Sequence, residues 1–170
     1  AKVLDLDWSP LTAGLSVNLP SGRAQRYEFA NNVVILDETY NAGLESMLAS
    51  LQLLADTPGN RRIAVLGTMK ELGERSPEFH QQVGTAVRDL NLDALFILAD
   101  PLEAEAMALG AKGVPYIEIE DLALDKAHDR LADRLKGFVR SGDRLLFKAS
   151  HSVQLDRVVA RLKSEFIVKS

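Results

Sequence analysis

Short apolar runs alternate with longer segments of helical period from residue 33 onward. Five runs of β-branched or large apolar residues predict strands, at residues 33–36, 62–66, 94–98, 114–119 and 144–147. Each run is nearly all apolar, as expected of strands that are covered on both faces. Because strands and helices alternate, the pattern predicts repeated βα units in an α/β fold, with a mainly parallel sheet of about five to six strands and helices on both faces.

The segments between these runs carry signals for helix starts and stops. A helix with Leu44 and Leu51 on its buried face is expected to end before Pro58. Ser76 followed by Pro77 predicts a capped helix start, and Asp100-Pro101 repeats this device. Two more helices are predicted from the apolar stripes Leu131, Leu135, Phe138, Val139 and Leu155, Val158, Val159, Leu162.

Residues 1–32 depart from this pattern. Pro10, Pro20 and Gly22 punctuate short segments, and LTAGLSVNL followed by AQRYEF predicts a β-ribbon. This stretch has too little apolar content to fold alone. We therefore expect residues 1–32 to be the tail of a preceding domain or an extension docked on the main domain, which covers residues 33–170.

Composition excludes several classes of protein. A chain of 170 residues fits one core. The formal net charge of −4, without clustered Lys and Arg, argues against nucleic acid as a partner. No apolar run approaches the roughly 20 residues of a membrane helix, so no membrane partner is expected. The chain shows no export signal and has no cysteine, which fits a cytoplasmic location.

Familiar cofactor motifs are not found in the sequence. There is no Gly-Lys-Ser/Thr P-loop, and the first two strand-to-helix turns read DETYNAGLESM and GTMKELGE where a dinucleotide fold needs GxGxxG. His80, His128 and His151 do not have ligand spacing. We therefore expect neither a tightly bound NAD or FAD nor a metal site built by this chain.

Two loops at the carboxyl ends of predicted strands carry the candidate chemistry, because ligands collect there in parallel α/β sheets. The loop at residues 37–43 holds two carboxylates, a hydroxyl, a phenol and an amide, which suit a ribose, a metal-bound phosphate or an ammonium group. Thr39 or Asn41 capping the next helix is the competing interpretation. The loop at residues 148–152 places a cation and two hydroxyls at a helix start, which suits a carboxylate. A capped helix with a solvated Lys148 is the alternative.

Two further residues favour an ordinary structural interpretation. His80 lies inside the helix that begins near Pro77, where a single histidine is usually structural. Arg23 follows a turn outside the main sheet, and most single surface arginines are simply solvated.

Three motifs in order carry a family resemblance. LDETYNAGLESM resembles the D-D-x-Y-N-A-N-P-x-S-M signature of the Mur ligases that add D-alanyl-D-alanine. RRIAVLGTMKELGERSPEFHQQVG resembles their V-x-G-D-M-x-E-L-G stretch with its downstream H-x-x-V-G, and LLFKASHSVQLDRVVARL resembles their L-V-K-G-S-R-S-x-x-M-E-x-V-V ending. The SGR at residues 21–23 matches the G-R that precedes the family's last domain, so the resemblance covers residues 21–162.

The resemblance implies a Rossmann-like carboxyl-terminal ligase domain at residues 33–170, preceded by the end of a central ATPase domain. In the family, ATP with Mg²⁺ phosphorylates the carboxylate of UDP-N-acetylmuramoyl-tripeptide, and the amine of D-alanyl-D-alanine attacks the acyl phosphate. The groups that handle phosphate belong to domains outside this sequence. The resemblance therefore implies a domain that closes over ATP and delivers the amine, and that is inactive alone.

The motif positions imply a site of two halves. Arg23 and the acidic pair Asp37 and Glu38 would face the nucleotide, with Tyr40 and Asn41 beside them. The residues implied near the incoming dipeptide are Lys148, Ser150, His151 and Ser152.

The sequence departs from the family's pattern in both halves. Glu38 stands for Asp, Gly43-Leu44 for Asn-Pro, and Thr68 for the Asp of G-D-M. Ala149 and His151 stand for Gly and Arg, and neutral His is a poorer partner for an anion than Arg.

Other interpretations stay open on the sequence alone. A sibling Mur ligase or a folylpolyglutamate-type ligase would share this layout, although the Y-N-A and M-K-E-L-G stretches favour the dipeptide-adding member. A free-standing flavodoxin-like binding module is the alternative from another class. It predicts a tight ligand site in the isolated chain, whereas a ligase domain predicts weak binding.

Overall fold

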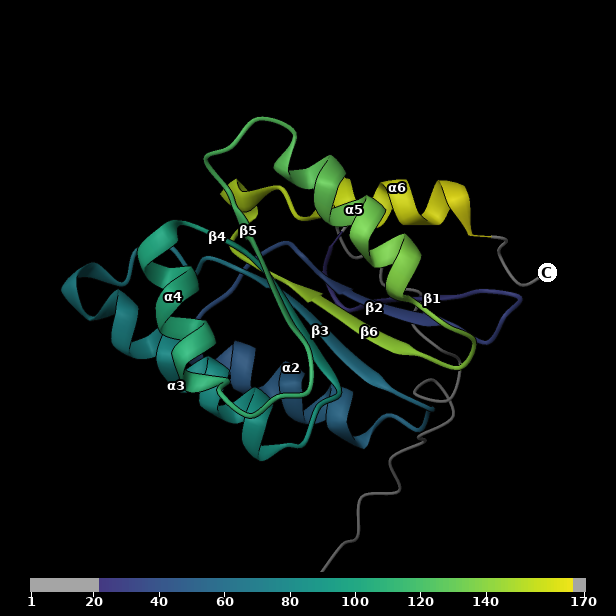
Figure 1. Cartoon of the computed structure of the whole chain (residues 1–170), viewed down its shortest axis with the longest axis horizontal. Coiled ribbons are helices and arrows are strands. Elements are labelled where there is room, and N and C mark those ends of the chain that lie inside the picture. The colour runs from purple at the N-terminus through teal and green to yellow at the C-terminus, as the bar shows by residue number, and fades with distance from the viewer. Residues whose placement is uncertain (1–21, 167–170) are drawn as a thin grey trace, which may run out of the picture.

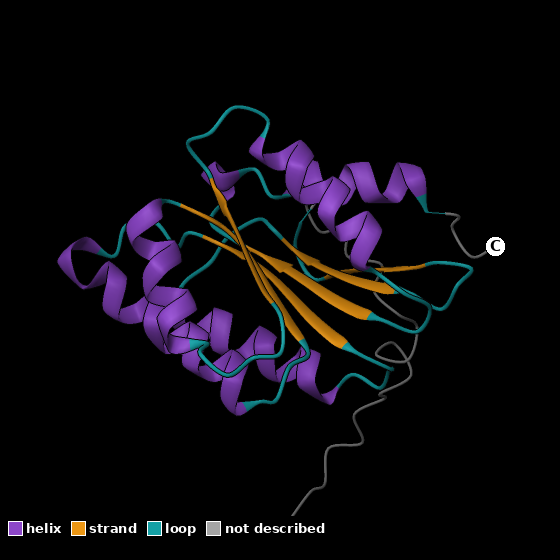
Figure 2. Ribbon diagram, in the orientation of Figure 1, coloured by secondary structure: helices purple, strands orange, loops and turns teal. Residues whose placement is uncertain are grey.

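The computed structural model describes residues 22–166 and shows a six-stranded sheet between two layers of helices (Figures 1 and 2). The strand order is β1-β2-β6-β3-β4-β5, and all neighbours are parallel except β1 and β2. This arrangement confirms the predicted α/β fold. The strands are β1 (Gln25–Glu28), β2 (Val34–Glu38), β3 (Arg62–Gly67), β4 (Ala94–Ala99), β5 (Ile117–Asp121) and β6 (Arg144–Lys148).

Helices cover both faces of the sheet because both faces of the central strands are apolar. One face packs against α2 (Leu44–Asp56), α3 (Ser76–Asp89) and α4 (Pro101–Gly110). The other packs against α5 (Ala127–Phe138) and α6 (Asp156–Glu165), as Figure 1 shows. The chain runs outward from β2 through β3 and β4 to β5, and then returns to the middle of the sheet as β6. This return makes β2 and β6 neighbours.

Five of the predicted strands are confirmed, with small shifts at their ends. β5 begins at Ile117 rather than at residue 114, because Val114 donates its N–H to Ala111 in a turn and Pro115 has no N–H to donate. The segment AQRYEF contributes β1, which pairs antiparallel with β2 at the edge of the sheet. Its expected ribbon partner, LTAGLSVNL, lies outside the described residues.

The predicted helix starts are placed within one residue. Asp100 is the N-cap residue of α4 as expected, whereas the cap expected at Ser76 is wrong. α3 begins at Ser76 itself, and the Ser76 hydroxyl donates to Glu103 on α4 at 2.9 Å. Asp100 precedes α4 without a side-chain cap, because its carboxylate accepts from Thr68 and Lys70 instead. Tertiary partners have captured both side chains.

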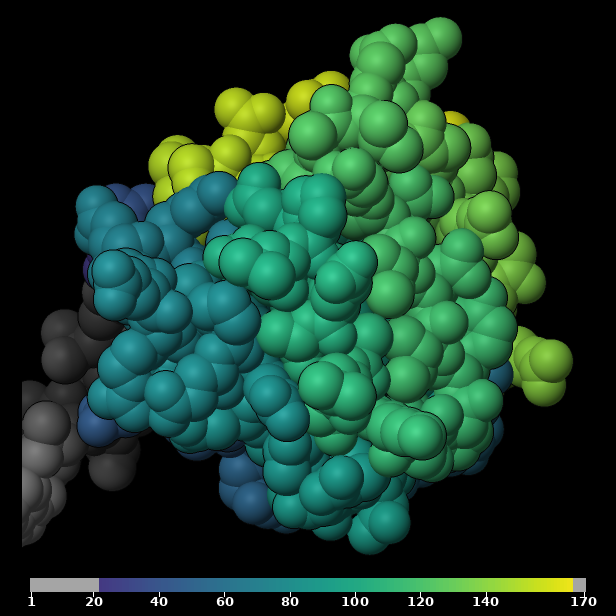
Figure 3. Space-filling model, turned by 60° about the vertical axis from the view of Figure 1, so that its left-hand side comes forward, coloured from purple at the N-terminus to yellow at the C-terminus, as the bar shows by residue number. Residues whose placement is uncertain are grey.

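α3 and α4 pack closely because small residues lie at their crossing, and Figure 3 shows them side by side. A Cβ on Gly84 would lie 1.9 Å from the carbonyl oxygen of Met107, and one on Gly110 would lie 2.0 Å from that of Gln81. These contacts fix α3 against α4, and with it the loop that joins β3 to α3.

Candidate functional site

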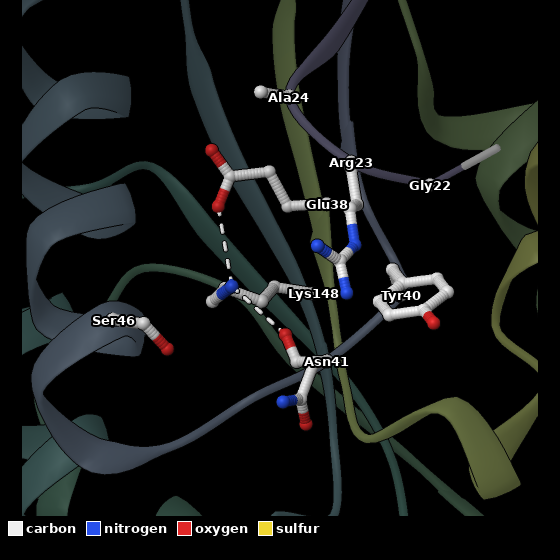
Figure 4. A pocket seen from close by; sticks show the side chains of 8 residues that line it. All are labelled: Gly22, Arg23, Ala24, Glu38, Tyr40, Asn41, Ser46 and Lys148. Atoms are coloured by element: carbon white, nitrogen blue, oxygen red, sulfur yellow. Dashed lines mark hydrogen bonds and ion pairs between the residues drawn. The ribbon is translucent and has the colours of Figure 1, made fainter. Parts of the chain in front are cut away.

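The carboxyl ends of β2 and β6 border a cavity of about 350 Å³ (Figure 4). The two strands are paired in register, so Glu38 and Lys148 end side by side. The loop after β2 and the start of α2 close the cavity on one side, and the segment before β1 closes it on another. Its lining residues are Gly22, Arg23, Ala24, Glu38, Tyr40, Asn41, Ser46 and Lys148.

Lys148 is the buried cation of this cavity, with a relative exposure of 5%. Its ammonium donates to the carbonyl oxygen of Asn41 at 2.9 Å and lies 3.2 Å from the carboxylate of Glu38, as the dashed lines in Figure 4 show. An ammonium group has three N–H donors, and these contacts use two of them. Lys148 therefore retains one donor at the cavity, and its charge is already balanced by Glu38.

Asp37 and Glu38 lie on opposite faces of the sheet, because successive side chains of a strand alternate. Glu38 shares the α2 face with Leu36, where the Ser50 hydroxyl contacts its carboxylate. Asp37 lies on the α6 face, is almost fully buried and does not line the cavity. The structure thus brings Glu38 to Lys148, Arg23, Tyr40 and Asn41 and leaves Asp37 apart.

Asp37 forms hydrogen bonds within the loop after β2. Its Oδ1 accepts from the backbone N–H of Thr39 at 3.1 Å and from the Thr39 hydroxyl at 2.8 Å. Burial raises the pKa of Asp37, and the two hydrogen bonds from Thr39 only partly oppose this shift. These bonds close a turn directly before Tyr40 and Asn41.

Arg23 stacks on Tyr40 at the mouth of the cavity. The guanidinium carbon lies 3.9 Å from the ring centroid, a cation–π distance. The Tyr40 N–H donates to the Gly22 carbonyl at 3.0 Å, so the two segments are also joined through the backbone. Gly22 has a φ of +82°, and a Cβ there would lie 2.6 Å from the Thr39 hydroxyl. Only glycine fits this close approach without strain.

The loop after β6 divides into a buried and an exposed part. Ser150 is buried: its hydroxyl accepts from the Lys70 N–H at 2.9 Å, and its own N–H donates to Thr68 at 3.1 Å. His151 and Ser152 are exposed, and the His151 ring lies 5.6 Å from the Tyr40 ring between centroids. Ser150 therefore ties two loops together, while His151 lies next to the Arg23–Tyr40 stack.

Sequence reasoning missed two serines on α2 that belong to this site. Ser46 lines the cavity, and Ser50, one helical turn later, contacts Glu38. The spacing Ser-x-x-x-Ser directly after the acidic loop is a signal that would have placed both hydroxyls on one helix face.

The site combines cations with hydrogen-bonding groups and suits a ligand that carries negative charge. Arg23 and the remaining donor of Lys148 can hold an anionic oxygen. Within residues 22–166, no three His, Asp or Glu side chains are grouped as metal ligands, and Glu38 is occupied by Lys148 and Ser50. These residues do not form a magnesium site by themselves.

Within residues 22–166, no helix is long and apolar enough to cross a membrane.

Comparison with known proteins places this chain in a family. Residues 22–151 match the family described as Mur ligase, glutamate ligase domain. Over 97% of its length the chain is 54% identical to the UDP-N-acetylmuramoyl-tripeptide–D-alanyl-D-alanine ligase of Synechocystis, and spans 35% of that protein. It is 33% identical to the ligase of the same name from Escherichia coli over 90% of its length, and spans 32% of that protein.

A solved structure supports the same relationship. The MurF ligase of Thermotoga maritima in complex with ADP superimposes with a TM-score of 0.71 and 33% identity, covering 93% of this chain and 35% of the ligase. The chain thus spans about a third of the length of its relatives. Because the family match covers most of the chain, including every residue that lines the cavity, this chain belongs to the Mur ligase family, glutamate ligase domain.

Proposed function

We propose that this chain is the carboxyl-terminal domain of an ATP-dependent ligase that joins D-alanyl-D-alanine to UDP-N-acetylmuramoyl-tripeptide, a cytoplasmic step that makes a peptidoglycan precursor. The observation that carries the proposal is the 54% identity to the Synechocystis ligase across 97% of this chain. Residues 33–170 would be the carboxyl-terminal domain, and residues 1–32 the tail of the central ATPase domain or a docked extension. The remaining domains of the ligase would bind most of the ATP and Mg²⁺.

The nucleotide half of the site is assigned to the Arg23 side of the cavity. Arg23 is exposed, stacked and free to meet a phosphate when another domain closes over it. Glu38, Tyr40 and Asn41 complete this wall, and Asp37 would act through the turn that it stabilises. The ADP bound to the Thermotoga relative supports a nucleotide ligand for the family.

The dipeptide half is assigned to the end of β6. The remaining donor of Lys148 would bind the carboxylate of D-alanyl-D-alanine, with His151 and Ser152 exposed on the neighbouring loop and Ser150 fixing that loop. The dipeptide amine would then attack the tripeptide acyl phosphate, form the amide bond and expel phosphate. The contribution of this domain is orientation of the amine, since its described residues do not assemble a phosphate-transfer site.

The test is a chimera in which this chain replaces the matching third of the Synechocystis ligase. We expect the chimera to consume ATP and ligate D-alanyl-D-alanine, and the 170 residues alone to do neither. Arg23→Ala in the chimera should raise the apparent constant for ATP several-fold. A tenfold rise would correspond to a loss of about 1.4 kcal/mol in binding free energy. Arg26→Ala is the matched control, because Arg26 is an exposed arginine on β1 that pairs with Glu28.

Two results would contradict the proposal. One is a folded chimera without ligase activity. The other is ligation by the purified 170 residues alone, which would show that the phosphate-handling groups lie within this chain.

A further inference from the structure

Two histidines outside the cavity hold the loops beside it. One accepts a hydrogen bond from its loop, and the other donates one to its loop. His80 on α3 is fully buried and contacts the loop after β3. His128 on α5 is half-buried and contacts the turn after β6. Neither residue lines the cavity, so their contacts concern the position of the loops.

The contacts of His80 determine its protonation. The backbone N–H of Met69 points at Nε2 from 2.9 Å and must donate, so Nε2 carries no proton. Nδ1 lies 2.7 Å from the carbonyl oxygen of Ser76, so Nδ1 carries the proton and donates. The ring is therefore held as one neutral tautomer, with both nitrogens used.

The bond to Met69 is the first of a short chain of contacts. The next backbone N–H, that of Lys70, donates to the Ser150 hydroxyl at 2.9 Å, and the Ser150 N–H donates to Thr68 at 3.1 Å. The loop after β3 is thus fixed to α3 on one side and to the loop after β6 on the other. Glu71 follows with a left-handed φ of +64°, so the backbone beyond Lys70 is bent sharply.

We propose that His80 is a positioning residue that holds the loop after β3 against the loop after β6, and that protonation of its imidazole releases this hold. A proton on Nε2 would face the Met69 N–H with a second donor. The Met69–His80 bond would be lost, and a buried donor would have no acceptor.

The surroundings of His80 favour the neutral ring at neutral pH. Burial lowers its pKa below the ordinary 6.5, and the nearby cation of Lys70 acts in the same direction. The Ser76 carbonyl on its own helix, Glu103 on α4 and Asp100 at the end of β4 oppose the shift. Because the unfolded chain takes up the proton more readily, this contact stabilises the fold fully above pH 6.5 and less as the pH falls toward the lower, folded value.

His128 supplies a natural control within the same chain. Its Nε2 lies 2.7 Å from the carbonyl oxygen of Val153, so it must donate. A donor nitrogen keeps its proton when the ring becomes charged, so acid does not break this contact. Acid is therefore expected to break the His80 contact and to leave the His128 contact in place.

The experiment follows amide hydrogen exchange in the ¹⁵N-labelled 170-residue chain, as protection factors corrected for pH, from about pH 7.5 down to the pH at which the His80 imidazole signals have titrated. Acid should reduce the protection factors of the Met69, Lys70 and Ser150 amides roughly tenfold. The midpoint of this loss should match the pH at which the His80 imidazole signals titrate. Leu95, whose N–H bonds to Tyr116 beside β4, should stay protected. His128→Phe should leave this acid response unchanged.

Two variants at His80 separate positioning from simple packing. His80→Phe should lose protection at all three loop amides even at neutral pH, while Leu95 keeps its protection. His80→Gln, whose amide oxygen can accept from Met69, should restore protection and remove its dependence on pH. The proposal is overturned if His80 titrates while Met69 stays protected, or if Lys70 and Ser150 do not follow Met69. If His80→Phe does not fold, the exchange data of the unsubstituted chain and of His80→Gln still test the proposal.

An effect on catalysis rests on the proposed function, whereas the exchange result does not. In the chimera, acid below the ordinary histidine pKa of 6.5 should raise the apparent constant for the dipeptide, and His80→Gln should flatten that rise. An inactive chimera with the expected exchange result would remove the ligase assignment and leave the positioning role of His80 intact.

Discussion

Strand β6 carries a buried cation at each end, and the two cations differ in the groups that surround them. Arg144, 8% exposed at the amino end, donates to the backbone carbonyls of Pro58 and Asn32, both at 2.6 Å. Lys148, 5% exposed at the carboxyl end, meets a carboxylate and one carbonyl and borders a cavity. A buried cation is structural where carbonyls surround its donors. It becomes a candidate for ligand binding where a donor remains beside open space.

The packing around the two cations has the same contrast. At the amino end, a Cβ on Gly59 would lie 2.5 Å from the Arg144 side chain, and one on Gly142 would lie 2.2 Å from Asn60. At the carboxyl end, a Cβ on Gly43 in the loop after β2 would have no heavy atom within 4 Å. The amino end of β6, around Arg144, is its closed end and fixes the strand. The carboxyl end, around Lys148, is its open end and presents side chains from neighbouring strands to a ligand.

The largest effect is expected at the closed end. Arg144→Met would remove the charge-assisted hydrogen bonds to the carbonyls of Pro58 and Asn32, at a cost of about 3 kcal/mol or more in the free energy of unfolding. Urea unfolding of the 170-residue chain measures this loss. Arg88→Met, an exposed arginine of α3 that pairs with Asp89, is the control and should change stability by no more than about 0.5 kcal/mol. Equal effects of the two substitutions would remove the structural role of Arg144.

A smaller effect is expected at the open end. Lys148→Met leaves the mostly buried Glu38 carboxylate without its cation and should cost about 2 kcal/mol. Adding Glu38→Gln removes the uncompensated charge, so the double variant should recover about 1 kcal/mol relative to Lys148→Met. A double-mutant cycle by urea unfolding measures this coupling. Strictly additive losses would mean that the pair is not an energetic unit.

The smallest effect is expected at Asp37, the acidic residue that lies apart from both cations. Its pKa is raised by burial, so the folded state holds the proton more firmly, and stability declines as the pH rises from 3.8 through the folded value. Asp37→Asn keeps an oxygen that can accept from Thr39. We expect it to raise stability at neutral pH by about 0.5 kcal/mol and to flatten the pH dependence. Marked destabilisation by Asn would instead show that the carboxylate charge is required there.

The helices and strands were predictable because their signals are local. Apolar runs marked the five parallel strands, and Pro77 and Pro101 marked helix starts within one residue. The cap expected of Ser76 was wrong, and Asp100 is an N-cap residue without a side-chain cap bond. Glu103 and Lys70, which lie far from them in sequence, bond to those side chains instead. Local patterns place an element, but they do not reveal which distant groups compete for its side chains.

The site was predictable as a set of loops and not as a set of contacts. Strand alternation alone could have separated Asp37 from Glu38. The pairing of Glu38 with Lys148 depends on β6 returning beside β2, which no local pattern encodes. For the same reason, residues assigned by sequence to a nucleotide half and a dipeptide half meet in one cavity.

One comparison in the chimera tests directly whether the remaining donor of Lys148 binds the dipeptide. Glu38→Gln alone serves as the reference, so that removing the lysine leaves no unpaired carboxylate. Adding Lys148→Met should raise the apparent constant for D-alanyl-D-alanine roughly tenfold or more, because a charge-assisted hydrogen bond of about 1.5 to 3 kcal/mol is lost, while the constant for ATP changes much less. An unchanged constant for the dipeptide in a folded double variant would contradict the account and leave Lys148 a structural cation like Arg144.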